Sequence, residues 1–205
     1  MSEKKLLKLN VGCYTVMFKD WLNIDVINDI RLYAYAGVNR LSFVSMDVTS
    51  GMLFDDNSID LIFCSHMIEH LTYREAEAFL KECHRIMKPG ACMRIGVPDL
   101  EIFVRLYQED LLSKVIDPIN EPSRRFAKYE VERFWEVLFA DHKSLYDFRT
   151  LSLLAEGSGF PVITKCTFGE GHPIITSECQ DQFKDISLYV EIFKGEPNGP
   201  KNSMG

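Results

Sequence analysis

Small or polar residues follow four β-rich runs in the first third of the chain. They are Gly12-Cys13, Asp25, Asp47 and Ser65-His66. In an open parallel sheet, ligands bind beyond the carboxyl ends of the strands, near the point where strand order reverses. Four such residues in succession, at the spacing of alternating strands and helices, therefore predict one binding edge.

The residue types at these strand ends suit a nucleoside. A carboxylate after the second strand, Asp25, can accept both hydroxyls of a ribose, and Asp47 after the third can accept the exocyclic amine of adenine. Gly12 lets the backbone approach a ligand closely. Each carboxylate alone could equally be a helix cap or a turn residue, and the two together favour the ligand site.

The segment His66-Met67-Ile68-Glu69-His70 matches H-x-x-E-H, a zinc-binding helix motif. Zinc would need both histidines on one helical face and a third ligand downstream. Here the segment begins at a strand end, which disfavours a metal shared by the two histidines. We therefore predict no metal site and interpret Glu69 and His70 as structural residues before the next helix.

Motifs for other chemistries are missing from the sequence. The turn at Gly12 lacks G-x-G-x-x-G, which argues against a nicotinamide oxidoreductase, and no G-x-S-x-G nucleophile is present. A hydroxyl acceptor would benefit from a base, and histidine is the natural choice near neutral pH. The candidates are His66 first, His142 second and Asp99 third, each of which could instead be structural.

The β-rich runs alternate with helical patterns, which is typical of a mostly parallel sheet covered on both faces. The fold class is therefore α/β. The expected strands are Leu6–Val11, Trp21–Asp25, Leu41–Met46, Ile59–Ser65, Cys92–Val97, Pro161–Phe168 and Ser187–Phe193.

Helix boundaries are marked by capping residues. Thr72 and Glu75 form a capping box for a helix over Thr72–Met87, and Lys88-Pro89-Gly90 ends it. Asp99 and Asp147 can each cap a further helix.

The connection over 113–146 is too long for a plain loop after the fifth strand. It carries an amphipathic, aromatic-rich stretch, which is either a lid or substrate wall or an extra packing helix. The residues of that stretch are Phe126, Tyr129, Phe134, Val137 and Leu138. We expect 1–194 to form a single domain and 195–205, rich in Gly, Pro, Asn and Ser, to be disordered.

Composition limits the partners and the compartment. The 205 residues carry a net charge of −7 without a basic run, so nucleic acid is an unlikely partner. The charged N-terminus does not resemble a signal peptide, and no stretch approaches the roughly 18 apolar residues of a membrane helix. Six scattered cysteines without a C-x-x-C pair indicate reduced thiols and a cytoplasmic protein.

Several segments together carry the pattern of a known family. They are Leu9-Asn10-Val11-Gly12-Cys13, Trp21-Leu22-Asn23-Ile24-Asp25, Ile68-Glu69-His70-Leu71, Lys88-Pro89-Gly90 and Arg94-Ile95-Gly96-Val97-Pro98-Asp99-Leu100. With these segments the chain resembles the small class I S-adenosylmethionine (SAM) methyltransferases. The resemblance implies a Rossmann-like, doubly wound sheet of seven strands, whose last strand is antiparallel, with a helical insert after the fifth strand.

The same resemblance implies SAM as the cofactor. Gly12 and Cys13 would lie along its methionine part, Asp25 at its ribose and Asp47 at its adenine, while Ser65-His66 would face the transferred methyl group. The full set of cofactor-binding residues implied in this way is Asn10, Gly12, Cys13, Asp25, Asp47, Val48 and Ser65.

One position departs from the family pattern. Tyr14 stands where the family has the second glycine of Gly-Cys-Gly, and its side chain could crowd the cofactor or turn outward. We predict a methyltransferase that acts on a small-molecule or glycan-type (carbohydrate) acceptor. The alternative is a methyltransferase-like fold that has lost catalysis and serves as a binding or assembly module.

Overall fold

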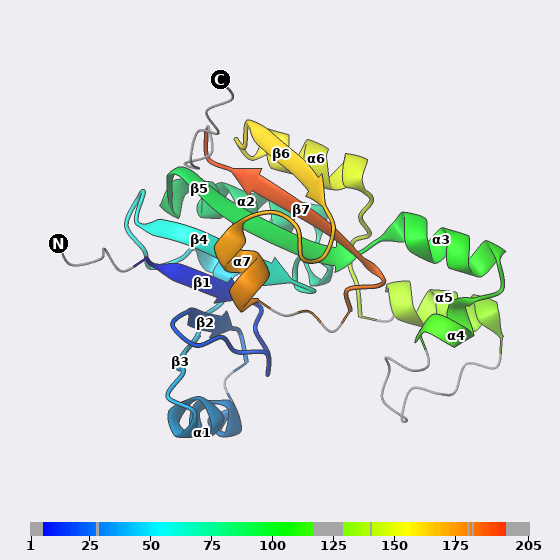
Figure 1. Ribbon diagram of the computed structural model, residues 1–205, viewed down its shortest axis with the longest axis horizontal. Coiled ribbons are helices and arrows are strands. Elements are labelled where there is room, and N and C mark those ends of the chain that lie inside the picture. Colours follow the sequence, from blue (N-terminus) through cyan, green and yellow to red (C-terminus); the bar gives the residue numbers. More distant parts are fainter. Residues whose placement is uncertain are drawn as a thin grey trace.

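A seven-stranded sheet runs through the part of the chain that the computed structural model describes, namely 6–27, 29–116, 129–139, 141–179, 181 and 183–195. The strands are β1 (Lys8–Val11), β2 (Leu22–Asp25), β3 (Ser42–Ser45), β4 (Ile59–Ser65), β5 (Met87–Pro98), β6 (Val162–Cys166) and β7 (Ser187–Phe193). Their order is β3-β2-β1-β4-β5-β7-β6 (Figure 1), and β7 is antiparallel to both of its neighbours. The predicted fold class is confirmed, and strand order reverses between β1 and β4.

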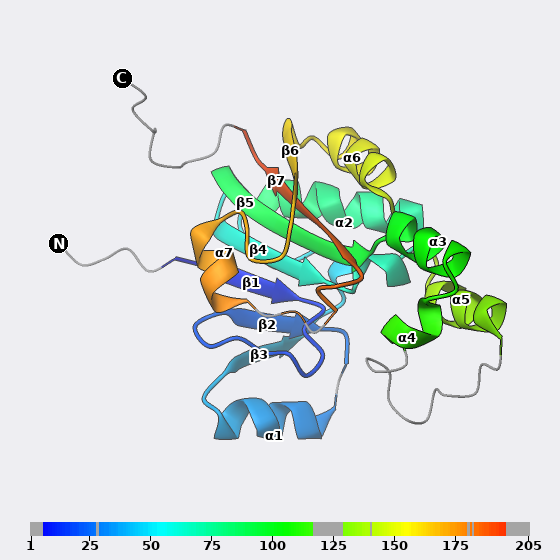
Figure 2. The same cartoon turned by 45° about the vertical axis from the view of Figure 1, so that its right-hand side comes forward.

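Helices cover both faces of the sheet. They are α1 (Ile30–Val38), α2 (Tyr73–Ile86), α3 (Leu100–Gln108), α4 (Leu112–Ile116), α5 (Glu130–Phe139), α6 (Phe148–Gly157) and α7 (Pro173–Glu178), with short 3-10 turns η1 (Val48–Ser50) and η2 (Ile68–His70). Helices α2 and α6 lie behind the sheet and α7 in front of it (Figure 2). Strand β4 alternates accordingly, because Ile62 and Cys64 pack in the core with α2 whereas Leu61 and Phe63 pack in the cluster that contains α7.

Helix α2 begins as its sequence predicts. The Thr72 hydroxyl accepts a hydrogen bond from the Glu75 amide, and the Glu75 carboxylate accepts one from the Thr72 amide. The next strand starts five residues before the predicted Cys92, directly at Met87. The β4–β5 pairing is irregular between Ile59 and Leu61, which accommodates the Lys-Pro-Gly segment inside the strand.

The connection from β1 to β2 is unusual, because 12–21 crosses between two parallel strands without a helix. Two buried amides organise it instead. Asn10 Nδ2 donates to Asn23 Oδ1 at 2.8 Å and to the carbonyl of Val16 at 2.7 Å. Asn23 in turn exchanges hydrogen bonds with the backbone N–H and C=O of Phe18.

Helix α7 covers the face left open by that loop. Ile175 packs in one cluster with Phe18 and Trp21. The Glu178 carboxylate accepts a hydrogen bond from the Trp21 indole at 2.7 Å and pairs with Lys8 of β1. The helix is too short for a clear periodicity, and the sequence did not predict it.

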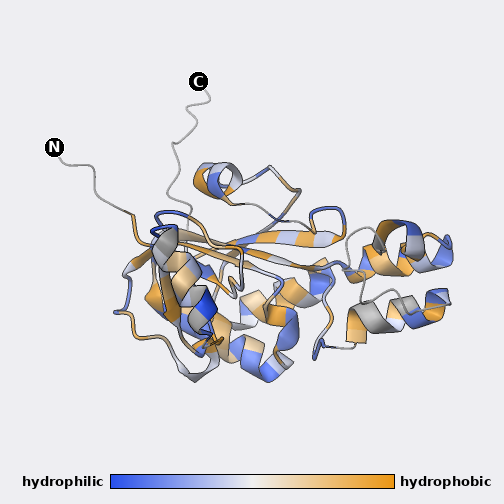
Figure 3. Ribbon diagram, turned by 90° about the horizontal axis from the view of Figure 1, so that it is seen from below, coloured by the Kyte–Doolittle hydropathy of each residue, from blue (hydrophilic) through white to orange (hydrophobic). Residues whose placement is uncertain are grey.

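Helices α3, α4 and α5 form a separate packing unit beyond the end of β5, and α3 and α5 carry mixed hydrophobic and hydrophilic residues (Figure 3). Leu138 is fully buried and Phe134 packs beside it, as the amphipathic pattern predicts. Tyr129 is exposed, because it precedes the first turn of α5. Phe126 and the tail 196–205 lie outside the described residues. Within those residues, no helix is long and apolar enough to cross a bilayer.

Candidate active site

The turn after β1 requires glycine at position 12. Gly12 has φ +72°, and a Cβ there would lie 2.4 Å from the Cβ of Met67. The neighbouring Cys13 is buried, and its burial, reinforced by the charge of Asp25, raises the pKa of the thiol to about 12. Cys13 is therefore an inert thiol at neutral pH, and Gly12 has a packing role besides any contact with a ligand.

Tyr14 has a left-handed backbone conformation, which glycine adopts more readily than any other residue. Its φ is +41°, a region that costs a residue other than glycine about 1–3 kcal/mol. Its amide donates to Asp25 Oδ2 at 2.8 Å, and its side chain is 60% exposed. The turn thus folds around the Asp25 carboxylate, and the Tyr14 ring lies largely in solvent.

The other residues predicted at the cofactor edge have protein partners. Both protons that Asn10 donates through Nδ2 go to Val16 and Asn23, so its side chain positions the loop. The Asp47 carboxylate caps η1 by accepting from the Thr49 amide and hydroxyl and from the Ser50 hydroxyl, and these bonds lower its pKa. Val48 is buried beside it.

The end of β4 meets the segment that precedes β7. Ser65 Oγ donates to Asp181 Oδ2 at 2.6 Å, and the Tyr189 hydroxyl donates to the same oxygen at 2.8 Å. His66 has φ +51°, and its Nε2 lies 2.8 Å from Ser187 Oγ. Sequence reasoning missed Asp181, because the residue stands in a segment without any motif.

Two of the three predicted catalytic candidates come together around a buried carboxylate. His66 Nδ1 lies 3.3 Å from Glu69 Oε1. The negative charge of Glu69 also acts on His142, where it favours the protonated imidazole. Burial lowers the pKa of His142. The third candidate, Asp99, caps α3 through the Glu101 amide at 3.0 Å, and burial raises its pKa.

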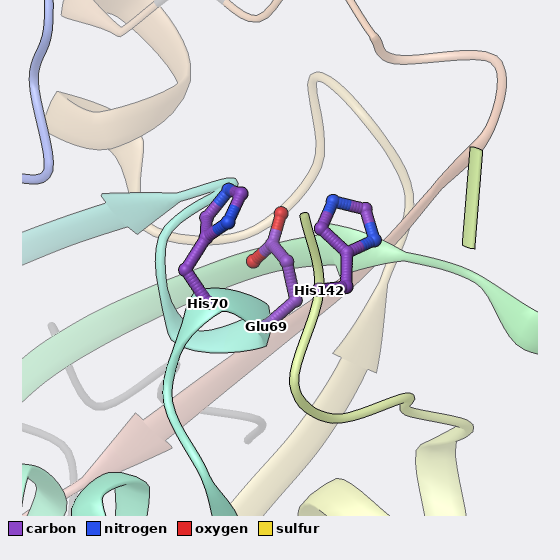
Figure 4. Close-up of side chains that lie close together, drawn as sticks. All are labelled: Glu69, His70 and His142. Carbon is purple, nitrogen blue, oxygen red and sulfur yellow. The ribbon is translucent and has the colours of Figure 1, made fainter. Parts of the chain in front are cut away.

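Glu69, His70 and His142 form a compact cluster (Figure 4), with the carboxylate between the two rings. Each residue offers one metal-ligating atom, and these atoms lie within 4.8 Å of one another. The H-x-x-E-H interpretation considered a metal shared by His66 and His70. The cluster instead joins His70 to a histidine 72 residues further along the chain.

A hollow of about 530 Å³ opens beside this edge of the sheet. Ser187, the partner of His66, lines it together with Asp99 and Tyr189. Arg105 and Lys184 also line it, as do Glu101 and Lys165, which form an ion pair at 3.7 Å. The hollow therefore offers hydrogen-bonding groups and charges of both signs next to His66.

Comparison with known proteins supports the fold. Solved structures that share it include a SAM-dependent methyltransferase from Archaeoglobus fulgidus, with a TM-score of 0.57 at 14% identity over 94% of this chain and 87% of that chain. Another is the N-methyltransferase NodS from Bradyrhizobium japonicum in complex with S-adenosyl-L-homocysteine, with a TM-score of 0.52 at 12% identity over 92% of this chain and 77% of that chain.

Sequence comparison supports the family. The family model of the methyltransferase domain matches residues 9–95. Demethylmenaquinone methyltransferases from two strains of Staphylococcus epidermidis are 32% identical over 104 residues, which are 49% of this chain and 40% of the length of those relatives. The chain has the class I SAM-dependent methyltransferase fold. Residues 9–95 belong to the methyltransferase domain family, which confirms the resemblance seen in the sequence.

Proposed function

We propose that the protein is a SAM-dependent methyltransferase that acts on a small-molecule or glycan-type acceptor. The observation that carries this proposal is the turn at the switch point between β1 and β4. Gly12 and Tyr14 both have the left-handed conformation there, and the turn closes around Asp25 at the end of β2. This is the place where open α/β sheets bind nucleotides.

The residues at this turn fit the cofactor. Asp25 accepts hydrogen bonds from two backbone amides, of Tyr14 and Ile27, and a carboxylate has about four acceptor sites. It therefore has capacity for ribose hydroxyls, and Asp47, with three bonds, retains less. We propose that Asp25 holds the ribose, Asp47 and Val48 flank the adenine, and Gly12, Cys13 and Ser65 adjoin the methionine part.

The chain's own contribution to methyl transfer is positioning. Bound SAM supplies an electrophilic methyl group, and orientation of the acceptor accounts for most of the remaining rate. We propose that the acceptor occupies the hollow beside His66, with α3 as one wall. Ile102 and Arg105 of α3 line the hollow, and its lining of apolar surface with hydroxyl groups and charges of both signs suits a small acceptor that has both apolar and polar parts.

Thermal unfolding tests the cofactor assignment. A ligand that binds only the native state at 100 times its Kd stabilises it by about 2.7 kcal/mol. Millimolar SAM, or its demethylated product, should therefore raise the Tm by about 5–10 °C for a chain of this size. Asp25→Ala should abolish the shift, whereas Asp55→Ala, which removes an exposed carboxylate away from the turn, should retain it.

The alternative proposal is a catalytically inactive binding or assembly module. Tyr14 in the family's glycine position is the observation that favours it, together with the hydrogen bonds that Asn10 makes within the protein. The absence of any Tm shift with either ligand would exclude the enzyme and leave this alternative.

A further inference from the structure

We infer that Glu69, His70 and His142 form a binding site for a divalent transition-metal ion, of which Zn²⁺ is the representative. The three side chains converge from η2 and from the loop after α5 (Figure 4). The site lies beyond the end of β4 and shares no residue with the proposed cofactor turn.

The Glu69 carboxylate is the principal observation. The residue is 1% exposed, and neither of its side-chain oxygens has a hydrogen-bond partner. Most buried polar atoms in proteins are hydrogen-bonded, and a buried charge without compensation is strongly unfavourable. A cation bound between the carboxylate and the imidazoles would supply the missing partner.

Each of the two histidines has a ring nitrogen without a hydrogen bond to the described residues. His70 Nδ1 lies 2.9 Å from the carbonyl of Asp141, so Nδ1–H donates to that oxygen and Nε2 is left with its lone pair. Ligating histidines commonly use their second nitrogen in this way. His142 Nδ1 is buried without a hydrogen-bond partner.

The backbone holds the cluster together before any ion binds. The amides of Lys143 and Ser144 both donate to the carbonyl of Glu69, at 2.9 and 3.1 Å. Ser144 Oγ also donates to the carbonyl of Leu71 at 2.8 Å. His142 is therefore fixed against η2, although 72 residues separate it from His70. A preorganised set of donors binds a metal without the cost of ordering a loop.

The donor set selects the class of ion. Two imidazoles and one carboxylate suit Zn²⁺ and similar transition metals, whereas Mg²⁺ and Ca²⁺ prefer oxygen ligands alone. Three protein ligands leave at least one coordination position open for water or a substrate oxygen. If the proposed methyltransferase function holds, the acceptor can supply that oxygen, because His66 contacts both Glu69 and Ser187, and Ser187 lines the acceptor hollow.

Metal binding can be measured on tag-free protein treated with chelator. Titration with Zn²⁺ in competition with a chromophoric chelator, followed by dialysis and elemental analysis, should give one ion per chain. Co²⁺ at the same site should give visible d–d absorption bands. His142→Gln and Glu69→Gln should each weaken Zn²⁺ binding by more than the roughly 10- to 100-fold that loss of an outer-sphere partner costs.

A matched control separates this site from other histidines. His84 lies on α2 with its ring against Phe160, so His84→Gln removes a histidine from elsewhere in the fold and should leave Zn²⁺ affinity unchanged. Equal affinities in His84→Gln and His142→Gln, or the absence of stoichiometric Zn²⁺ binding by the wild type, would overturn the inference. Circular dichroism of each variant verifies folding.

The metal site and the proposed function can fail separately. The Tm shift caused by SAM depends on Asp25, and metal binding depends on Glu69 and the two histidines. Binding of Zn²⁺ without binding of SAM would support the metal site and contradict the proposed methyltransferase function. Binding of SAM without binding of Zn²⁺ would support the proposed function and contradict the metal site.

Discussion

Glu191 and Glu69 are both buried carboxylates, but the protein surrounds them differently. Glu191 on β7 is 4% exposed and forms an ion pair with Arg94 of β5, with Oε1 lying 2.6 Å from Nη2 and 3.1 Å from Nε. The same oxygen accepts the His172 amide at 2.7 Å. Glu69 is 1% exposed, and its nearest ionisable group is His66 at 3.3 Å, without a hydrogen bond.

This difference indicates a structural role for the charge of Glu191 and a ligand-binding role for the charge of Glu69. The Arg94–Glu191 pair lies in the register of the antiparallel strands and also binds the adjacent loop, because Arg94 donates to the carbonyl of Glu170. A Cβ at Gly171 would collide with both side chains of the pair, so the loop passes directly over it. Folding thus satisfies Glu191 completely. Folding leaves the Glu69 oxygens without a hydrogen bond, so a bound cation or a protonated His66 must compensate the charge.

The largest expected effect is on the satisfied pair. Arg94→Met leaves the Glu191 carboxylate buried without a countercharge and should lower the free energy of unfolding by about 3–5 kcal/mol. The double variant Arg94→Met/Glu191→Leu should recover most of this loss, because an apolar pair of similar volume can replace a buried ion pair. Urea unfolding followed by circular dichroism gives the three values.

An exposed ion pair provides the control for this measurement. Lys81 and Glu77 form a pair one helical turn apart on the outer side of α2, with both side chains about half exposed. Lys81→Met should therefore cost less than about 1 kcal/mol. A loss as small as this in Arg94→Met would mean that the Glu191 charge is not buried in solution.

The second prediction concerns the unsatisfied carboxylate. In chelator-treated protein, Glu69→Gln should change the free energy of unfolding by no more than about 1 kcal/mol, or increase it, because the variant removes a buried charge that lacks compensation. The backbone carbonyl of Glu69 keeps its bonds to Lys143 and Ser144. A loss of about 3–5 kcal/mol would instead show that Glu69 is paired with a protonated His66, and the contrast with Glu191 would disappear.

The sequence predicts the fold better than it predicts these partnerships. Strand runs, the Thr72–Glu75 capping box and the caps at Asp99 and Asp147 are local patterns, and all of them occur in the structure. The family motif correctly indicates the position of the turn after β1. The motif does not show that the Asn10 side chain donates both of its hydrogen bonds within the protein, to Val16 and Asn23.

Long-range contacts account for what the sequence could not predict. Glu69 and His142 are distant along the chain, and only the docking of the loop after α5 onto η2 brings them together. Asp181 meets Ser65 because β7 returns antiparallel beside β5. Neither contact has a periodicity or a spacing that could be recognised. Glu69 was therefore interpreted as a satisfied structural residue, whereas its oxygens accept no hydrogen bond in the structure.

The smallest expected effect involves Asp99, a third buried carboxylate, compared with Asp147. Both cap helices, but burial raises the pKa of Asp99 above its ordinary value of 3.8, whereas hydrogen bonds from Thr150 lower that of Asp147. As pH rises through the range from 3.8 to the raised pKa, the folded protein loses stability at Asp99, because its charged form is disfavoured there. The charged form of Asp147 contributes to the free energy of unfolding in full above pH 3.8, and this contribution is lost as pH falls through the lowered pKa.

Replacement by asparagine should therefore have opposite effects at the two caps. Asparagine caps a helix about as well as aspartate does, so each substitution mainly removes the titration. Relative to wild type, Asp99→Asn should gain stability as pH rises above about 4, and Asp147→Asn should be less stable at neutral pH and approach wild type in acid. Urea unfolding between pH 3 and pH 8 measures both differences. If Asp99→Asn instead becomes less stable than wild type as pH rises, as expected for Asp147→Asn, then hydrogen bonding outweighs burial at Asp99. The Asp99 carboxylate would then be compensated within the fold, as that of Glu191 is.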